Sequence, residues 1–174
     1  SSAASDVYKR QKPMFEESVF PYLRKKQPEI IYSQMVKICS IGESQVAEEI
    51  EDLIESQTNP TIAPYAKTGE VHLRITAKGK NEKECKKLIK PVVKELKARF
   101  GRNIFATEES KSLEEAVVDM LKEQEMTLSL AESCTGGAIA ARIVNVSGAS
   151  EVFLQGMVTY PVSYTHLTLP TNSR

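Results

Sequence analysis

The sequence predicts a mixed α/β chain: an α+β domain with the element order β-α-β-β-α-β, followed by the opening of a second α/β domain. Stretches in which apolar and polar residues alternate are interleaved with stretches whose apolar residues recur at helical spacing. A charged segment at residues 107–111 divides these stretches into two series, one before it and one after it. The chain has 174 residues, 41% of them hydrophobic, which suffices for one or two small domains.

The first series is expected to form one domain over residues 28–108. Residues 30–41 are rich in Ile, Val, Met and Tyr and are predicted to form a strand. Ser44 is predicted to cap a helix whose apolar positions follow at helical spacing. Residues 61–66 and 70–77 are then predicted to pair as a hairpin.

The second strand of the hairpin and the elements after it complete this domain. The strand's alternation predicts a buried face and a solvated face, made respectively of Val71, Leu73 and Ile75 and of His72, Arg74 and Thr76. Asn81 is predicted to cap a long helix that ends before Gly101, and Pro91 is expected to kink it. With a last strand over residues 103–106, the domain is an α+β sandwich whose helices cover one face of the sheet.

Residues 12–26, ahead of the first strand, have a partly helical pattern that Pro21 is expected to interrupt. The apolar side chains of this segment have no obvious partner in the remaining sequence. We therefore interpret residues 12–27 as the last helix of a domain that lies upstream.

The second series, residues 112–161, begins with a capping box formed by Ser112 and Glu115. The apolar face of the helix that follows is predicted to consist of Leu113, Ala116, Val117, Met120 and Leu121. Strands are predicted over residues 127–131 and 152–160, with a helix between them. Two strands are too few to close a core, so this segment is interpreted as the truncated start of an α/β domain.

Both ends of the chain are predicted to be foreign to the protein. Residues 6–11 and 162–167 can be encoded by one DNA segment read in opposite directions, a relation that folding does not explain. We therefore interpret residues 1–11 and 162–174 as non-native segments derived from a sequencing adapter, and the gene as cut at both ends.

Composition limits the class of protein. Lys plus Arg and Asp plus Glu both number 23, so the net charge is zero, which argues against a dedicated nucleic-acid binder. The three cysteines lie far apart and have no metal-ligand spacing, and their odd count argues against a disulfide framework. We expect no cofactor. No apolar run is long enough to span a membrane, and a cytoplasmic protein is expected.

The strongest candidate for chemistry is the run Glu132-Ser133-Cys134-Thr135-Gly136-Gly137, between a predicted strand and a predicted helix. Free backbone N–H groups and the positive end of the helix dipole are expected there, which suits a phosphate or a developing oxyanion. The two glycines would let a ligand approach the backbone closely. The alternative is a tight turn with hydroxyl caps and no ligand.

Other candidates are single residues. Ser150 and Tyr160 could act as nucleophile or proton donor, although isolated residues of these types are usually structural. Cys134 could be a thiolate at the helix start, but a small packed residue is the favoured interpretation. His72 is interpreted as a solvated sheet residue, and His166 falls in the segment predicted to be foreign.

The helix predicted after Asn81 is rich in lysine. These side chains could contact the phosphates of a nucleic acid. A solvated outer face, tempered by three glutamates, is the favoured interpretation.

Several stretches, taken in this order, resemble the competence/damage-inducible CinA family. They are residues 13–16 (PMFE), 42–44 (GES), 57–66 (QTNPTIAPYA), 131–137 (AESCTGG) and 158–160 (VTY). The resemblance implies a missing upstream molybdopterin-binding-like domain, a central KH-type domain, and the start of a nicotinamide-nucleotide amidase domain. That amidase converts nicotinamide mononucleotide to nicotinic acid mononucleotide and ammonia without a metal.

The resemblance also implies roles for the candidate residues. Ser150 would attack the carboxamide carbon and form an acyl-enzyme, and Tyr160 would assist proton transfer. Ser133 would be the third catalytic residue, beside the substrate and the oxyanion, and its role relative to Ser150 stays open. Cys134, Thr135, Gly136 and Gly137 would bind the substrate. The lysine that serves the family as base, shortly after the Tyr160 position, is replaced here by the suspect tail, so this chain as written is predicted to be inactive.

The alternative is that the central KH-like unit is a non-catalytic module. It could bind a nucleic acid or a protein partner, or join and dimerise catalytic domains. The sequence lacks the Gly-x-x-Gly loop that clamps nucleic acid in KH domains, so nucleic-acid binding is not expected. A homo-oligomer is expected for the full-length parent.

Overall fold

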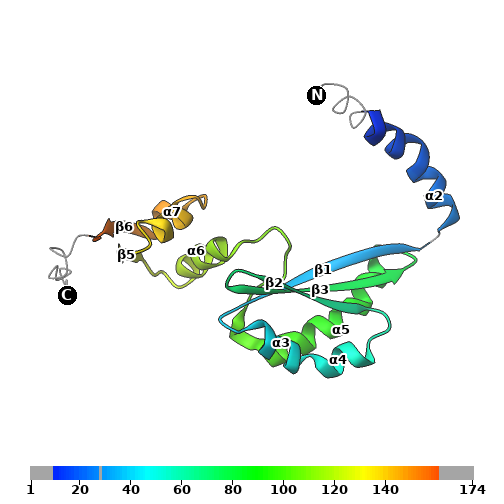
Figure 1. The fold of residues 1–174 in the computed structure, drawn as a ribbon, viewed down its shortest axis with the longest axis horizontal. Helices are drawn as coiled ribbons and strands as arrows, with labels where there is room; N and C mark the ends of the chain where they lie inside the picture. Colours follow the sequence, from blue (N-terminus) through cyan, green and yellow to red (C-terminus); the bar gives the residue numbers. More distant parts are fainter. Residues whose placement is uncertain (1–9, 28, 161–174) are drawn as a thin grey trace. The chain divides into compact units, whose positions relative to one another are not determined.

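The computed structural model describes residues 10–27 and 29–160. The chain divides into two compact units, Ser1–Glu109 and Ser110–Arg174, which are described separately below (Figure 1). Most of the two segments predicted to be foreign, together with His166, lies outside the described residues. Within the described part of the chain, no helix is long and apolar enough to cross a membrane.

Unit 1 is built on a four-stranded antiparallel sheet in the order β2-β3-β1-β4. Its strands are β1 (Ile30–Cys39), β2 (Thr61–Lys67), β3 (Glu70–Gly79) and β4 (Ile104–Ala106). The predicted hairpin is confirmed, with Ile62 opposite Ile75. The strand and helix order, together with this sheet order, is that of the split β-α-β sandwich.

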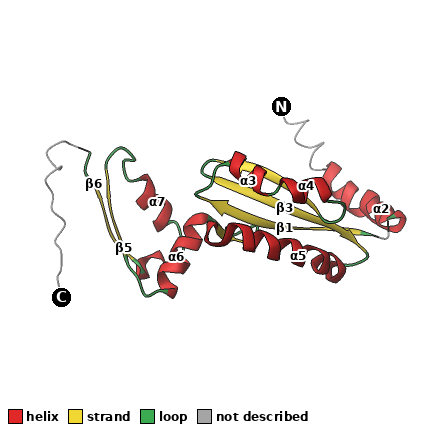
Figure 2. Ribbon diagram, turned by 90° about the horizontal axis from the view of Figure 1, so that it is seen from below, coloured by secondary structure: helices red, strands yellow, loops and turns green. Residues whose placement is uncertain are grey.

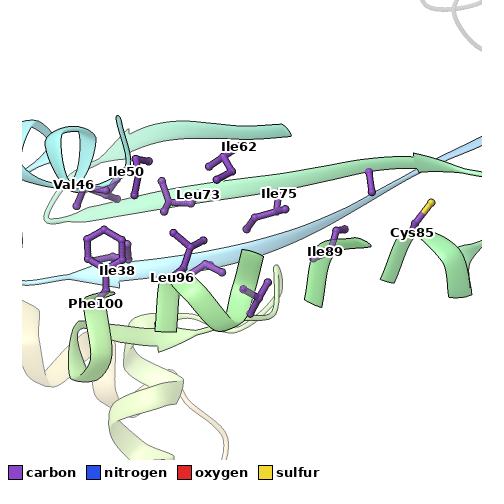
Figure 3. Close-up of a cluster of buried hydrophobic side chains, with 14 residues drawn as sticks. Ile38, Val46, Ile50, Ile62, Leu73, Ile75, Cys85, Ile89, Leu96 and Phe100 are labelled. Carbon is purple, nitrogen blue, oxygen red and sulfur yellow. The ribbon is translucent and has the colours of Figure 1, made fainter. Parts of the chain in front are cut away.

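Three helices cover one face of this sheet (Figures 1 and 2): α3 (Glu43–Glu49), α4 (Glu51–Ser56) and α5 (Glu82–Phe100). The core between the helices and the sheet is wholly apolar (Figure 3); its fully buried members include Ile38, Ile50, Leu73, Ile89 and Leu96. The alternation predicted for β3 is confirmed, because Val71, Leu73 and Ile75 are buried and their neighbours are not. The mixed α+β class predicted from the sequence is therefore correct.

The helix ends of unit 1 agree with the sequence at two positions and differ at a third. The side chain of Asn81 accepts a hydrogen bond from the Glu84 N–H at 2.9 Å, and Gly101 has a positive φ of 48° at the end of α5. The predicted Ser44 cap is wrong: α3 begins at Glu43, and Gly42 precedes it without a side-chain cap. The predicted single helix is also divided into α3 and α4 at Ile50.

The N-terminal segment is helical through Pro21, which the sequence predicted as an interruption. A π-helical turn, η1 (Phe15–Val19), leads directly into α2 (Phe20–Lys26), and the Phe20 N–H bonds to the Phe15 carbonyl. Pro21 thus lies inside a continuous helical run, directly after the π-helical turn, a local irregularity of the kind found where a proline removes a helix N–H. Met14, Phe15 and Phe20 are exposed. The interpretation of this segment as the last helix of an upstream domain stays a prediction.

Unit 2 contains a two-stranded parallel sheet with short helices. Its elements are α6 (Leu113–Glu123), β5 (Leu128–Glu132), α7 (Ala138–Val144), the 3-10 turn η3 (Ala149–Glu151) and β6 (Phe153–Val158). The capping box of Ser112 and Glu115 is confirmed. The apolar face predicted for α6 is partly wrong: Met120 is 54% exposed, while Val118 is fully buried, so the packed face is turned toward Val118.

Candidate functional site

The run singled out in the sequence forms the connection from β5 into α7. Gly136 and Gly137 both have positive φ, 60° and 92°, a conformation that residues with a Cβ adopt at a cost. A Cβ on Gly137 would lie 3.2 Å from Cγ2 of Val158 in β6. The predicted turn is therefore confirmed, and both glycines are needed for the backbone path.

Glu132, the last residue of β5, is the centre of this connection. Its side chain is almost fully buried, with 4% of the residue exposed. One carboxylate oxygen accepts the Thr135 hydroxyl at 2.7 Å and the Ile139 N–H at 2.9 Å, and the other accepts the Ala140 N–H at 2.7 Å. The carboxylate thus caps the start of α7 from the end of the preceding strand.

Two opposing influences set the pKa of Glu132. Desolvation by burial, the largest, raises it, but the hydrogen bonds from Thr135 and from the N–H groups of Ala140, Ile139 and Gly137 together lower it below its ordinary value of 4.5. Glu132 is therefore a carboxylate at neutral pH, at the helix end where a negative charge is favoured.

This arrangement corrects the expectation of free N–H groups at the start of α7. The amides of Ile139 and Ala140 already donate to Glu132, as does the Thr135 hydroxyl, so none of the three is available to a ligand. Glu132 was part of the run predicted to carry chemistry, but no role was predicted for it. An acidic residue between a strand and a helix N-terminus was the signal that could have identified it.

The exposed part of the connection is Ser133, Cys134 and Thr135. The backbone N–H groups of Cys134 and Thr135 have no hydrogen-bond partner among the described residues. Cys134 is exposed, so the favoured interpretation of a small packed residue is wrong. A hydroxyl, a thiol and two unpaired amides thus lie together on the surface, a set that can bind an anion or a developing oxyanion.

Tyr160 lies at the same edge of the sheet as this connection. β5 and β6 are parallel, with Glu132 opposite Val158, so their carboxyl ends meet at one edge. The Thr159 N–H donates to the Glu132 carbonyl at 2.6 Å, which brings the chain after β6 against the start of the connection. Tyr160 follows directly and is 73% exposed.

Ser150 lies at the opposite edge. It is an exposed residue of η3, which precedes β6, and the Leu128 N–H at the start of β5 donates to the Val152 carbonyl two residues after Ser150. The six residues of β6 separate this edge from the other by about 20 Å. Within one chain, the structure therefore brings Ser133 and Tyr160 to a common edge but does not bring Ser150 to them.

His72, in unit 1, is paired within its own strand. His72 was interpreted as solvated, but its side chain is only 13% exposed and its Nε2 lies 2.7 Å from a Glu70 carboxylate oxygen. The described residues include no group of three His, Cys, Asp or Glu side chains that could hold a metal ion.

Two family models match this chain, and the boundary between them coincides with the boundary between the two units. Residues 33–106 match the family described as "Damage-inducible protein CinA KH domain", and residues 110–172 match the "CinA C-terminal domain". The second match extends into the segment predicted to be foreign, whose origin stays a prediction. The fold and the matches define a KH-type α+β unit followed by part of a CinA C-terminal domain.

Longer relatives support the same assignment. A "Putative competence-damage inducible protein" of Clostridium beijerinckii is 55% identical over 165 residues, covering 95% of this chain and 40% of the relative. A "CinA-like protein" of Dictyoglomus turgidum is 54% identical over 148 residues, covering 85% of this chain and 36% of the relative. The chain belongs to the CinA family and spans about two fifths of the length of these relatives.

Proposed function

We propose that the chain is part of a nicotinamide-nucleotide amidase, which hydrolyses the carboxamide of nicotinamide mononucleotide to nicotinic acid mononucleotide and ammonia. One observation carries the proposal: the exposed Ser133–Thr135 connection, with two unpaired backbone amides, lies at the carboxyl edge of the parallel strands beside Tyr160. This edge is where α/β sheets bind their ligands.

The reaction proposed at this edge of the sheet is transfer of the nicotinoyl acyl group to water. In the full-length parent, the lysine that serves the family as base, shortly after Tyr160, takes the proton of the serine Oγ as this oxygen attacks the carboxamide carbon. The N–H groups of Cys134 and Thr135 hold the oxyanion that forms. The proton then passes through Tyr160 to the nitrogen, the C–N bond breaks to release ammonia, and water hydrolyses the serine ester and returns a proton to the serine Oγ. The proposal involves no metal.

The assignment of the nucleophile has a structural consequence. We propose Ser150 for this role, as the family resemblance implies, with Ser133 beside the substrate. Because β6 holds Ser150 about 20 Å from Tyr160 in one chain, Ser150 has to reach the edge from a second copy. The proposed enzyme is therefore a homo-oligomer whose sites combine two chains, located in the cytoplasm.

Mixed oligomers of the full-length parent test this proposal. Ser150→Ala and Tyr160→Phe variants are each expected to release no ammonia from nicotinamide mononucleotide. When they are co-expressed as a dimer, half the dimers contain one copy of each variant and one intact site, so about a quarter of the wild-type activity should return. Ser133→Ala, measured alone, is the comparison variant.

The outcomes separate the parts of the proposal. No restored activity in the mixture would show that the site does not combine two copies. Activity retained by Ser150→Ala and lost in Ser133→Ala would transfer the nucleophile to Ser133. A wild-type parent that releases no ammonia would reject the amidase.

A further inference from the structure

Glu132 is a buried charge that the proposed reaction does not use. Only 4% of the residue is exposed, and no other charged side chain described in unit 2 is buried to this extent. Burying a carboxylate costs free energy unless hydrogen bonds replace the lost water. Its two oxygens accept three such bonds, from the Thr135 hydroxyl and the N–H groups of Ile139 and Ala140. The carboxylate is therefore engaged within the protein and does not touch a substrate.

Capping of α7 alone does not require this buried charge. A serine, threonine or asparagine at the N-cap position satisfies helix N–H groups without burying an ion. The N-cap residue of α7 is instead Gly137, which has no side-chain cap. The capping group comes from the last residue of β5, so the bonds of Glu132 close a ring around the connection that lies between the strand and the helix.

The connection inside this ring is held by its own carbonyl groups as well. The Ser133 carbonyl accepts the Gly136 N–H, and the Thr135 carbonyl accepts the Ala138 N–H, both at 3.0 Å. Thr135 is thus bound to the protein through its carbonyl and through its hydroxyl. In this orientation its N–H and that of Cys134 have no partner among the described residues. The bonds that fix the connection are therefore separate from the two N–H groups proposed to hold the oxyanion.

The main chain of Glu132 also holds the segment that leads to Tyr160. Its carbonyl accepts the Thr159 N–H at 2.6 Å and the Thr159 hydroxyl at 3.2 Å. The side chain of Glu132 is thus bound to the connection and to α7, and its carbonyl is bound to the chain directly before the proposed proton carrier.

We propose that Glu132 is a positioning residue of the amidase. Its carboxylate holds the N–H groups of Cys134 and Thr135 at the place where the carboxamide oxygen becomes an oxyanion. Donors that are fixed before the reaction stabilise an oxyanion best, because they do not have to reorganise as the charge develops. This inference rests on the proposed function, since it gives a task in that reaction to a residue that touches no reacting atom.

A sulfur-substituted substrate measures the position of these N–H groups. Thionicotinamide mononucleotide carries sulfur in place of the carboxamide oxygen, and sulfur is the weaker hydrogen-bond acceptor, with a longer bond to carbon. Ammonia release from both substrates gives a ratio of kcat/KM values, oxygen over sulfur, that depends on how well the donors fit the oxygen. The ratio is unchanged when a variant merely contains fewer folded molecules, because the same molecules hydrolyse both substrates.

The full-length parent with Glu132→Gln should show a lower kcat for nicotinamide mononucleotide, by about tenfold or more, with little change in KM. The oxygen-over-sulfur ratio should also fall by about tenfold, because displaced donors no longer fit the oxygen. Thr135→Val keeps the charge and the backbone N–H but removes one of the three bonds to the carboxylate. It should lower the ratio by less than Glu132→Gln does.

Glu114→Gln is the matched control. Glu114 lies in the same unit, its side chain is 19% exposed, and its carboxylate accepts a hydrogen bond from Arg142 in the last turn of α7. The control therefore removes a charged bond to the same helix, at the end away from the connection. It should keep the wild-type kcat and the wild-type ratio.

The outcomes separate this inference from the proposed function. A wild-type parent that releases no ammonia would reject the proposed function and this inference with it. In an active parent, a wild-type ratio in Glu132→Gln, or equal changes in Glu132→Gln and Glu114→Gln, would overturn the positioning role alone. If Glu132→Gln does not fold, Thr135→Val decides, and a wild-type ratio in that variant would overturn the role.

Discussion

Replacement of Glu132 by glutamine isolates the charge that holds the candidate site together. The substitution keeps the length of the side chain but exchanges one of its two acceptor oxygens for an NH₂ donor. In the structure, one oxygen serves Thr135 and Ile139 and the other serves Ala140. The amide therefore cannot satisfy both sides, and at least one helix N–H is left facing a donor.

Hydrogen exchange of the individual amides gives the magnitude. Loss of a charge-assisted hydrogen bond should accelerate exchange at Ile139, Ala140 or both by about tenfold or more. Amides in β3, in the other unit, should be unchanged. Thr135→Val is the control, because it removes only the hydroxyl donor and should leave the two helix amides protected. Unchanged exchange at both amides in Glu132→Gln would refute the reasoning.

The pH dependence of amide exchange in the wild-type chain is a second test of the hydrogen bonds from Ile139 and Ala140 to Glu132. Because the pKa of Glu132 is lower in the folded chain than its ordinary 4.5, the stabilisation is fully present above pH 4.5. It should be lost as the pH falls through the folded-state pKa. Protection of the two amides, corrected for intrinsic exchange, should be flat from pH 7 to pH 5 and decrease only below that range; a decrease between pH 7 and pH 5 would contradict the assignment.

Three further substitutions test the local structure. Gly136→Ala should destabilise the connection by about 1–2 kcal/mol, because Gly136 has a positive φ. Gly137→Ala should cost more, because its new Cβ would also contact Val158 in β6. Hydrogen exchange of the α7 amides measures both costs, and equal costs would contradict the contact with β6. Ser112→Ala should destabilise α6 by about 1 kcal/mol through loss of its capping box, seen as faster exchange in the first turn; an unchanged first turn would count against the cap. Leu73→Ala should lower the free energy of unfolding of unit 1, measured in urea, by about 2–5 kcal/mol, because Leu73 is fully buried. Ile31 is 67% exposed, so Ile31→Ala should change this free energy by about 0.5 kcal/mol or less. Similar costs for the two variants would contradict the assigned core.

Unit 1 could be predicted closely from the sequence because its signals are local and mutually consistent. Alternation in β3, the Asn81 cap and the glycine after α5 each act within a few residues. The Ser44 cap failed because Gly42 and Glu43 offered the helix an earlier start that the pattern did not distinguish. In α6, adjacent Val117 and Val118 left two apolar faces possible, and only packing against η3 and α7 selected between them.

The candidate site was predictable as a location but not as a geometry. The run 132–137 was correctly placed between a strand and a helix. Its decisive contacts join Glu132 to amides seven and eight residues later, and no pattern of residue types fixes such a bond. The separation of Ser150 from Tyr160 follows from the parallel pairing of β5 with β6, which places the two ends of one strand at opposite edges.

The most direct test of the central claim is a titration of the ¹⁵N-labelled chain with nicotinamide mononucleotide, followed by backbone amide shifts. The largest shifts are expected at Ser133, Cys134 and Thr135, because this exposed connection carries the two N–H groups without a partner among the described residues. Shifts that leave these three amides unchanged while the ligand saturates another surface, or no shifts at any ligand concentration, would contradict the placement of the substrate at this edge.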